Sequence, residues 1–307
     1  MSRKVLITGA AGFIGENIAH RLHREPFGLY LAYGTRKPRS EALEKFSADL
    51  RVRGSFSGTL RDLRADTVVH TAALTNPDTC QRDPDRAHAV NVEGTREVAE
   101  WAESRGARMI YISTDLVYAG DGSFYREEDP TGPTNVYGET KLAGEEEVRR
   151  ICSDWVVLRL ALSYGPTRGV LGDWTRNMRA ALDEGKELTL FTDQFRTPAY
   201  AGDTAEAVFR FARGQGQGLY HMGGRERVSR YAFGIRFARA YGLPEDRFRP
   251  IAMADLPMDA SRAPDCSLNT EKIFLEIGLF PCDVEEGLKR QRDAEERAAR
   301  GVPECVW

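Results

Sequence analysis

The sequence of 307 residues has few cysteines and no long apolar run, and each scarcity excludes a class of protein. Its five cysteines form no Cys-x-x-Cys pair, so we predict neither a disulfide framework nor a zinc site. No apolar stretch approaches the roughly 18 residues that span a bilayer. A strand-like run begins within four residues of Met1, which leaves no room for a signal peptide. We therefore expect a cytoplasmic protein that does not enter a membrane.

The sequence also lacks an excess of charge of either sign. It carries 43 basic and 46 acidic residues, mixed along the chain, for a formal net charge of −3. Without a basic face, nucleic acid is not an expected partner, and a small molecule is the expected one. The five histidines show no spacing typical of metal ligands, so we predict no metal site and give these residues no catalytic role.

Short apolar segments alternate with segments of helical periodicity through the first half of the chain. The predicted strands are residues 4–8, 29–33, 67–70, 109–113 and 155–160. Helical spacing lies between most of them, for example at 13–22 and at 95–105. Parallel neighbours in a sheet need crossover connections, which helices usually supply. The alternation therefore predicts an α/β fold built on a Rossmann-type, doubly wound parallel sheet.

A glycine-rich turn follows the first predicted strand and opens the first predicted helix. It reads Gly9-Ala-Ala-Gly12-Phe-Ile-Gly15. Glycines let the backbone turn tightly and approach a pyrophosphate, while the free N–H groups of a helix start favour the anion. We predict that a dinucleotide binds here, although a tight turn without a ligand would need similar glycines. The predicted contacts from this segment are Gly9, Gly12, Phe13, Ile14 and Gly15.

The end of the second predicted strand indicates which dinucleotide binds. An acidic residue there suits the free 2′-hydroxyl of NAD, and an arginine suits the 2′-phosphate of NADP. The segment reads Tyr33-Gly-Thr-Arg36-Lys37 and contains no acid. Arg36, with Lys37 or Arg39, could clamp a phosphate, and a solvated basic loop is the alternative. We expect NADP(H) in preference to NAD(H).

The pattern changes after about Gly165, where loops become longer. Helical spacing continues at residues 174–184, 204–213 and 231–241 and from 283 to about 300, and the loops include residues 166–173. We predict an NAD(P)-binding Rossmann domain at 1–164. A smaller, mainly substrate-binding region follows at 165–307. Some of its segments, such as 219–222, would return to the main sheet. The last few residues, ending in Trp307, show no pattern.

Tyr137 and Lys141 are four residues apart and would project from the same face of a helix. A nearby cation lowers the pKa of a tyrosine towards the range useful for proton transfer, so the two form a workable acid–base pair. They follow the predicted strand 109–113, and ligands of open α/β sheets lie beyond the carboxyl ends of strands. Thr114 stands at that end, where its hydroxyl could bind the carbonyl oxygen that Tyr137 protonates. A chance pairing on a polar helix is the alternative.

Several motifs occur in a fixed order along the first half of the chain. They are TGAAGFIG at 8–15, HTAA at 70–73, NVEGT at 91–95, YISTDLVYAG at 111–120 and YGETK at 137–141. Together they resemble the extended short-chain dehydrogenase/reductases. The resemblance implies that Tyr137 is the general acid–base, that Lys141 holds the nicotinamide ribose and lowers the tyrosine pKa, and that Thr114 orients the carbonyl. It also implies that Ala72 and Ala73 line the cofactor groove.

Longer motifs are similar to those of the dTDP-4-dehydrorhamnose reductase family. They are STDLVYAGDG at 113–122, EEDPTGPTNVYGETKLAGE at 127–145, FTDQFRTPAYAGDTAEAV at 191–208 and RAPDCSLNTEKI at 262–273. This resemblance implies an NAD(P)H-dependent reductase that transfers hydride to a keto group of a sugar nucleotide. Similar 4,6-dehydratases carry Asp-Glu after the threonine, and the glutamate removes a proton. Here Asp115 is followed by Leu116, which disfavours dehydration.

The predicted substrate contacts, besides Thr114, are Asp115, Asn177 and Arg196. Arg196 could bind a diphosphate or a carboxylate, and a surface arginine is the equal alternative. Two further functions stay open. One is an epimerase of the same superfamily, which returns the hydride to its substrate. The other is a non-catalytic NADP-binding regulatory subunit like that of methionine adenosyltransferase, against which the intact Thr114, Tyr137 and Lys141 argue. A homodimer also stays open, since extended reductases often dimerise through a helix pair.

Overall fold

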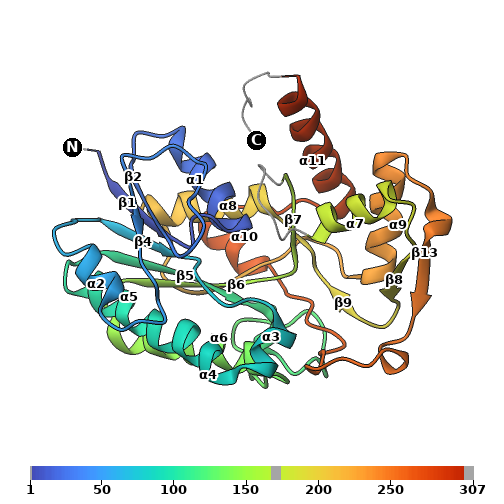
Figure 1. The fold of residues 1–307 in the computed structure, drawn as a ribbon, viewed down its shortest axis with the longest axis horizontal. Helices are drawn as coiled ribbons and strands as arrows, with labels where there is room; N and C mark the ends of the chain where they lie inside the picture. Colours follow the sequence, from blue (N-terminus) through green and yellow to red (C-terminus); the bar gives the residue numbers. More distant parts are fainter. Residues whose placement is uncertain (1, 167–173, 301–307) are drawn as a thin grey trace.

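A seven-stranded parallel sheet forms the centre of the molecule in a computed structural model, which describes residues 2–166 and 174–300 (Figure 1). The strands follow the order β11-β6-β5-β4-β1-β2-β3. Their bounds are β1 Lys4–Thr8, β2 Gly28–Tyr33, β3 Glu44–Ser47, β4 Thr67–His70, β5 Arg108–Thr114, β6 Trp155–Leu160 and β11 Gly218–Met222. The predicted Rossmann-type, doubly wound sheet is confirmed. Because the strand order reverses between β1 and β4, ligands of this fold bind at the carboxyl ends of these strands.

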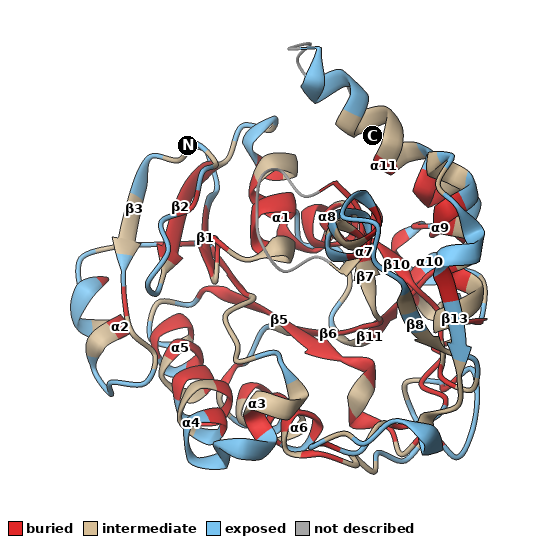
Figure 2. Ribbon diagram, turned by 45° about the vertical axis from the view of Figure 1, so that its right-hand side comes forward, coloured by how far each residue is buried: buried red, intermediate tan, exposed pale blue. Residues whose placement is uncertain are grey.

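Helices cover both faces of the sheet (Figures 1 and 2). One face carries α1 (Phe13–His23), α8 (Ala201–Ala212) and α10 (Glu271–Ile277), and the other carries α2 (Ser55–Thr59), α5 (Gly94–Glu103) and α6 (Val136–Ile151). Successive strand residues alternate between the two cores. Val5 and Ile7 of β1 pack with α1 and α8, whereas Leu6 packs with α2 and α5. Burial on both faces explains why these strands are nearly continuous apolar runs.

Two short helices between β4 and α5 were not predicted. They are α3 (Pro77–Arg82) and α4 (Pro84–His88), and a π-helical turn at Ala89–Glu93 joins α4 to α5. Each short helix has proline at its first position, where a missing N–H costs no hydrogen bond. The side chain of Asn76 caps α3, and that of Asp83 caps α4. These local signals, rather than an apolar periodicity, define the two helices.

The residues that follow β6 build a second lobe with its own core of aromatic and aliphatic side chains. Its helices are α7 (Trp174–Asp183), α9 (Arg230–Tyr241) and α11 (Val284–Ala299), with short 3₁₀ turns at Glu245–Arg247 and Met253–Asp255. Three two-stranded sheets complete it: β7 (Ser163–Tyr164) with β10 (Ala199–Tyr200), β8 (Leu188–Phe191) with β13 (Phe248–Ile251), and β9 (Phe195–Arg196) with β12 (Val228–Ser229). The second lobe lies beside the carboxyl end of β6 (Figure 1).

The chain passes between the sheet and the second lobe several times. After β10 it returns to the sheet as α8 and β11, and β11 pairs in parallel with β6. It returns again as α10, after β13. We propose the division into 1–164 and 165–307 on this path, with the returning segments assigned to the first unit. Of the predicted loop 166–173, residues 167–173 lie outside the described part, as does Cys305.

Within the described ranges, no helix is both long and apolar enough to cross a membrane. The cysteines that the structure describes are Cys80, Cys152, Cys266 and Cys282, and all four are buried free thiols. Each therefore contributes to packing rather than to a covalent link.

Candidate active site

Close backbone packing holds the glycine turn between β1 and α1. Gly9 has a φ of +64°, and a Cβ at this position would lie 2.5 Å from the backbone nitrogen of Ala72. A Cβ on Gly15 would lie 2.5 Å from the carbonyl oxygen of Gly9. Neither position has room for a side chain. Gly12 precedes α1 and no side chain caps the helix, so the first N–H groups of α1 can bind an anion.

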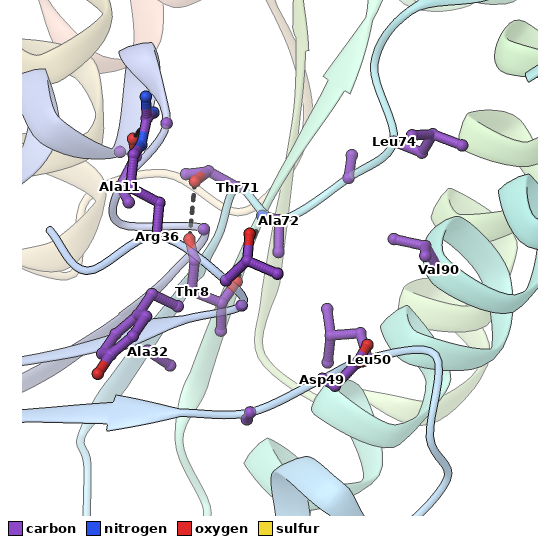
Figure 3. A pocket seen from close by; sticks show the side chains of 18 of the residues that line it. Thr8, Ala11, Ala32, Arg36, Asp49, Leu50, Thr71, Ala72, Leu74 and Val90 are labelled. Carbon is purple, nitrogen blue, oxygen red and sulfur yellow. Dashed lines mark hydrogen bonds between the residues drawn. The ribbon is translucent and has the colours of Figure 1, made fainter. Parts of the chain in front are cut away.

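A cleft of about 1170 Å³ lies at the carboxyl ends of β1, β2, β3 and β4 (Figure 3). The predicted cofactor residues that line it are Gly9, Gly12, Phe13, Ile14, Gly15, Arg36, Ala72 and Ala73. The hydroxyl of Thr71 donates to the carbonyl oxygen of Thr8 at 2.7 Å, which ties the ends of β1 and β4 together (Figure 3). The volume suits a large ligand such as a dinucleotide.

The basic loop after β2 is fastened to α1. The carboxylate of Glu16 is 2% exposed and accepts from the backbone N–H of Arg39 at 2.5 Å. It also accepts from the backbone N–H and the hydroxyl of Ser40. The guanidinium of Arg36 donates to the carbonyl oxygen of Ala11 and lines the cleft. The loop therefore has a fixed path at the edge of the cleft, and it carries arginines where an NAD-binding acid would otherwise stand.

Another part of the cleft is lined by residues that the sequence analysis did not single out. Asp49 and Leu50 follow β3, and Val90 lies in the π-helical turn (Figure 3). The guanidinium of Arg51 donates to both oxygens of Asp49, which lowers the pKa of this carboxyl. An acidic residue at the carboxyl end of a strand can indicate a residue that lines the ligand cleft. Asp49 was missed because the strand before it, β3, was not predicted.

Tyr137 lies at the end of β5 because the start of α6 packs closely against the residues that follow this strand. The side chain of Asn135 caps α6 by accepting from the N–H of Gly138 at 3.0 Å. A Cβ on Gly138 would lie 2.2 Å from the carbonyl oxygen of Leu116, so glycine permits this close approach. Burial raises the pKa of the Tyr137 phenol, and the nearby Thr114 opposes this rise. The phenol is therefore protonated at neutral pH and can supply a proton.

Lys141 lies one turn after Tyr137 and is 2% exposed. Its Nζ donates to the carbonyl oxygen of Ile112 at 2.7 Å and lies 4.0 Å from the centre of the Tyr111 ring. Burial lowers the pKa of Lys141 to about 7, and the charge of Glu145 opposes this shift. The structure differs from the expectation that Lys141 lowers the pKa of Tyr137. Burial of the phenol is the larger effect, and it raises that pKa.

A chain of buried hydrogen bonds connects the glycine turn to α6. Thr8 Oγ1 and His70 Nδ1 are 2.6 Å apart, and His70 Nε2 and Thr95 Oγ1 are 3.1 Å apart. The hydroxyl of Thr95 donates to the carbonyl oxygen of Asn91, whose side-chain amide donates to the hydroxyl of Thr140. Burial lowers the pKa of His70 to about 3, so the imidazole stays neutral. These hydrogen bonds fix the position of α6 relative to the cleft.

Asp115 and Arg196 form a buried ion pair next to Thr114. Asp115 Oδ1 accepts from the Thr114 hydroxyl at 3.1 Å. Asp115 Oδ2 lies 3.4 Å from Arg196 Nε but has no hydrogen-bond partner within the described residues. Burial raises the pKa of Asp115, and Arg196 opposes this. Arg196 is 5% exposed, which excludes the alternative of a surface arginine.

The predicted catalytic and substrate-binding residues thus lie in three places. Thr114, Asp115, Tyr137 and Arg196 meet at the carboxyl end of β5. Lys141 lies beneath them, against β5. Asn177 is exposed on α7, and its side chain makes no hydrogen bond or ion pair with any residue that the structure describes. Among all the residues that the structure describes, no cluster of His, Cys, Asp and Glu side chains could hold a metal ion.

The doubly wound sheet, the glycine turn and the placing of Thr114, Tyr137 and Lys141 define the class of protein. They are those of the extended short-chain dehydrogenase/reductases, as the motifs predicted. The family follows from comparison with known proteins. The model of the RmlD substrate binding domain family matches residues 3–296, and the chain belongs to this family.

Similar proteins match nearly the whole length of this chain. Methionine adenosyltransferase 2 subunit beta of Xenopus laevis is 30% identical over 278 residues, which are 87% of this chain and 81% of that protein. The dTDP-4-dehydrorhamnose reductase of Escherichia coli (strain K12) is 29% identical over 297 residues, or 93% and 96% of the two chains. The crystal structure of a dTDP-4-dehydrorhamnose reductase from Clostridium acetobutylicum, 26% identical, has a TM-score of 0.85 and covers 95% of this chain and 99% of that one.

Proposed function

We propose that the protein is an NAD(P)H-dependent reductase that transfers hydride to a keto group of a sugar nucleotide. One observation carries the proposal: the phenol of Tyr137 lies near Thr114 at the carboxyl end of β5, on the sheet edge that also holds the large cleft. A protonated phenol paired with a hydroxyl can bind and protonate a carbonyl oxygen. The similarity to the Escherichia coli reductase over 93% of this chain supports a sugar nucleotide as the substrate class.

The residues of the chain divide the work of a carbonyl reduction. A nicotinamide cofactor, when bound, would supply the hydride for the carbonyl carbon. Tyr137 donates its phenolic proton to the carbonyl oxygen, which becomes the alcohol, and Thr114 holds that oxygen by a hydrogen bond. Lys141 binds the nicotinamide ribose. The buried pair of Asp115 and Arg196 lies next to Thr114, where it would border the sugar.

We further propose that the cofactor is NADP(H) in preference to NAD(H). The arginines of the loop after β2 support this, because Arg36 lines the cleft and Glu16 fixes the path of the backbone at Arg39. A planar guanidinium binds a phosphate through paired hydrogen bonds, which an NAD ribose would not satisfy.

A second candidate function rests on the relative from Xenopus laevis. That protein is the beta subunit of a methionine adenosyltransferase, and it is 30% identical over 87% of this chain. On this alternative the cleft would hold a cofactor without turnover, and the protein would act through a partner. The placing of Tyr137 near Thr114 favours the reductase, because cofactor binding alone does not need it.

The test is a titration with NADPH and with NADH, followed by an absorbance assay of NADPH oxidation with dTDP-4-dehydrorhamnose. We expect tighter binding of NADPH and an oxidation that Tyr137→Phe abolishes. Tyr241→Phe, at the far end of α9, is the matched control and retains the wild-type rate. Binding of NADPH without oxidation of this or other keto sugar nucleotides would favour the regulatory alternative. Failure to bind either cofactor would refute both.

A further inference from the structure

Arg230 brings a positive charge towards the ion pair of Asp115 and Arg196. It begins α9 directly after β12, which pairs antiparallel with β9 so that Val228 lies opposite Arg196. The N–H of Arg230 donates to the carbonyl oxygen of Gln194 at 3.0 Å. Burial raises the pKa of Asp115, and the positive charge of Arg230 opposes this rise after that of Arg196, so the guanidinium lies within electrostatic reach of the predicted substrate contacts. No sequence motif had marked this residue.

The neighbouring arginines are occupied by acceptors of the protein itself. Arg196 donates from Nη2 to the carbonyl oxygen of Ala263 at 3.1 Å and from Nη1 to that of Phe195, while its Nε faces Asp115. These contacts hold the guanidinium of Arg196 in one orientation. They also leave it few donors for a ligand.

Arg262 is held in the same way. Its Nη1 donates to the carbonyl oxygen of Ala260 at 3.0 Å, and its Nη2 donates to Asp78 at 2.6 Å. The carboxylate of Asp78 also accepts from the N–H of Ala260. The charge of Arg262 is therefore balanced by a carboxylate at hydrogen-bond distance.

The guanidinium of Arg230 has no such acceptor. It lies 4.1 Å from the centre of the Trp174 ring and makes no hydrogen bond or ion pair with any residue in the described part of the chain. The Nε1 of Trp174 is also buried without an acceptor among those residues. Burial lowers the pKa of Arg230 to about 10, so the group is charged at neutral pH. Arg230 is only partly buried, so its free donors, beside the buried Nε1 of Trp174, can meet acceptor atoms of a ligand.

We propose that Arg230 binds an oxyanion of the substrate, either a phosphate of a nucleotide or the carboxylate of an acidic sugar. The inference rests on the proposed function and names a recognition residue for it. Around Asp115, the cations Arg196, Arg230 and Arg262 face the carboxylates of Asp115 and Asp78, which leaves one positive charge in excess. A neutral hydroxyl could accept hydrogen bonds from Arg230 but would not balance this charge, whereas an oxyanion does both.

The test is calorimetric titration of the NADP-saturated protein with dTDP, thymidine, UDP-glucose and UDP-glucuronic acid. Wild type is compared with Arg230→Gln, with Arg230→Lys, and with Arg239→Gln as the control on the same helix, where Arg239 is exposed and paired with Glu245. We expect Arg230→Gln to weaken the binding of the recognised anion roughly 10- to 100-fold. Arg230→Lys recovers part of this loss, and Arg239→Gln changes nothing.

The four compounds separate the two sources of the oxyanion. If the nucleotide phosphate is bound, dTDP loses affinity in Arg230→Gln and thymidine does not. If a sugar carboxylate is bound, only UDP-glucuronic acid loses affinity, and UDP-glucose does not. If Arg230→Gln does not fold, Arg230→Met takes its place in the titrations, because methionine keeps the aliphatic stem that packs on Trp174.

The inference and the proposed function fail in different ways. Unchanged affinities in Arg230→Gln, or a wild type that binds NADPH but none of the four compounds, would overturn the inference and leave the reductase standing. A wild-type protein that neither binds NADPH nor oxidises it with a keto sugar nucleotide would refute the proposed reductase function. Equal losses for thymidine and dTDP would show that Arg230 recognises no anion, and would overturn the inference as well.

Discussion

Replacing Lys141 by methionine should make the protein more stable while it removes activity. The folded protein holds this lysine with a pKa of about 7, against 10.5 for the ordinary side chain. At 1.36 kcal/mol for each pKa unit, keeping the charge in the buried site costs about 5 kcal/mol below pH 7. Methionine is of similar length and avoids this cost. Methionine also leaves the carbonyl oxygen of Ile112 without a donor, which destabilises the variant by about 1–3 kcal/mol. The net gain is about 2–4 kcal/mol.

The pH dependence of this gain is the sharper part of the prediction. Between pH 7 and 10.5 the unfolded chain binds a proton at Lys141 that the folded chain does not, so wild-type stability rises with pH through this window. The advantage of Lys141→Met should shrink by about 1.4 kcal/mol for each pH unit. Urea unfolding at several pH values between 6 and 10 measures it. A difference that does not change with pH, or that grows with pH, would refute the assignment of a charged, buried lysine.

Other predictions concern the same site. Arg36→Gln should weaken NADPH binding roughly 10- to 100-fold and leave NADH binding nearly unchanged, and equal losses in fluorescence titrations would contradict the phosphate contact. Gly15→Ala should destabilise the fold by about 1–3 kcal/mol in urea unfolding and abolish NADPH binding, because its Cβ would lie 2.5 Å from the carbonyl oxygen of Gly9. Tyr111→Leu should move the alkaline limb of kcat/KM for NADPH oxidation by about 1 pH unit towards acid, since the ring favours the ammonium of Lys141. Tyr111→Phe keeps the aromatic ring and should leave the alkaline limb of kcat/KM at its wild-type pH.

The sheet could be predicted because its inner strands carry their own signal. Residues 4–8, 67–70 and 155–160 are mostly buried and mostly apolar, and the structure has strands at these positions. The edge strand Glu44–Ser47 is only partly buried and has one large apolar residue, so it left no such signal. The two-residue strands of the second lobe are set by contacts with distant segments, which local periodicity cannot show.

The site shows the same division between local and distant information. The glycine turn could be predicted because its residues are adjacent in the chain and their chemistry is local. The effect of burial on Tyr137 and Lys141 could not be predicted, because it depends on what α6 packs against. Arg230 was missed because only the pairing of β9 with β12 brings it towards Arg196.

The late return of the chain to β6 has a consequence for synthesis on the ribosome. Until Met222 has emerged, the outer edge of β6 has no partner, and the face that Val208 and Phe211 of α8 later cover is open. An unpaired strand edge and an open apolar face are the surfaces through which nascent chains aggregate. We expect a fragment that ends at residue 164 to depend on chaperones or to precipitate. The nucleotide-binding half is therefore completed by residues that are made after much of the second lobe.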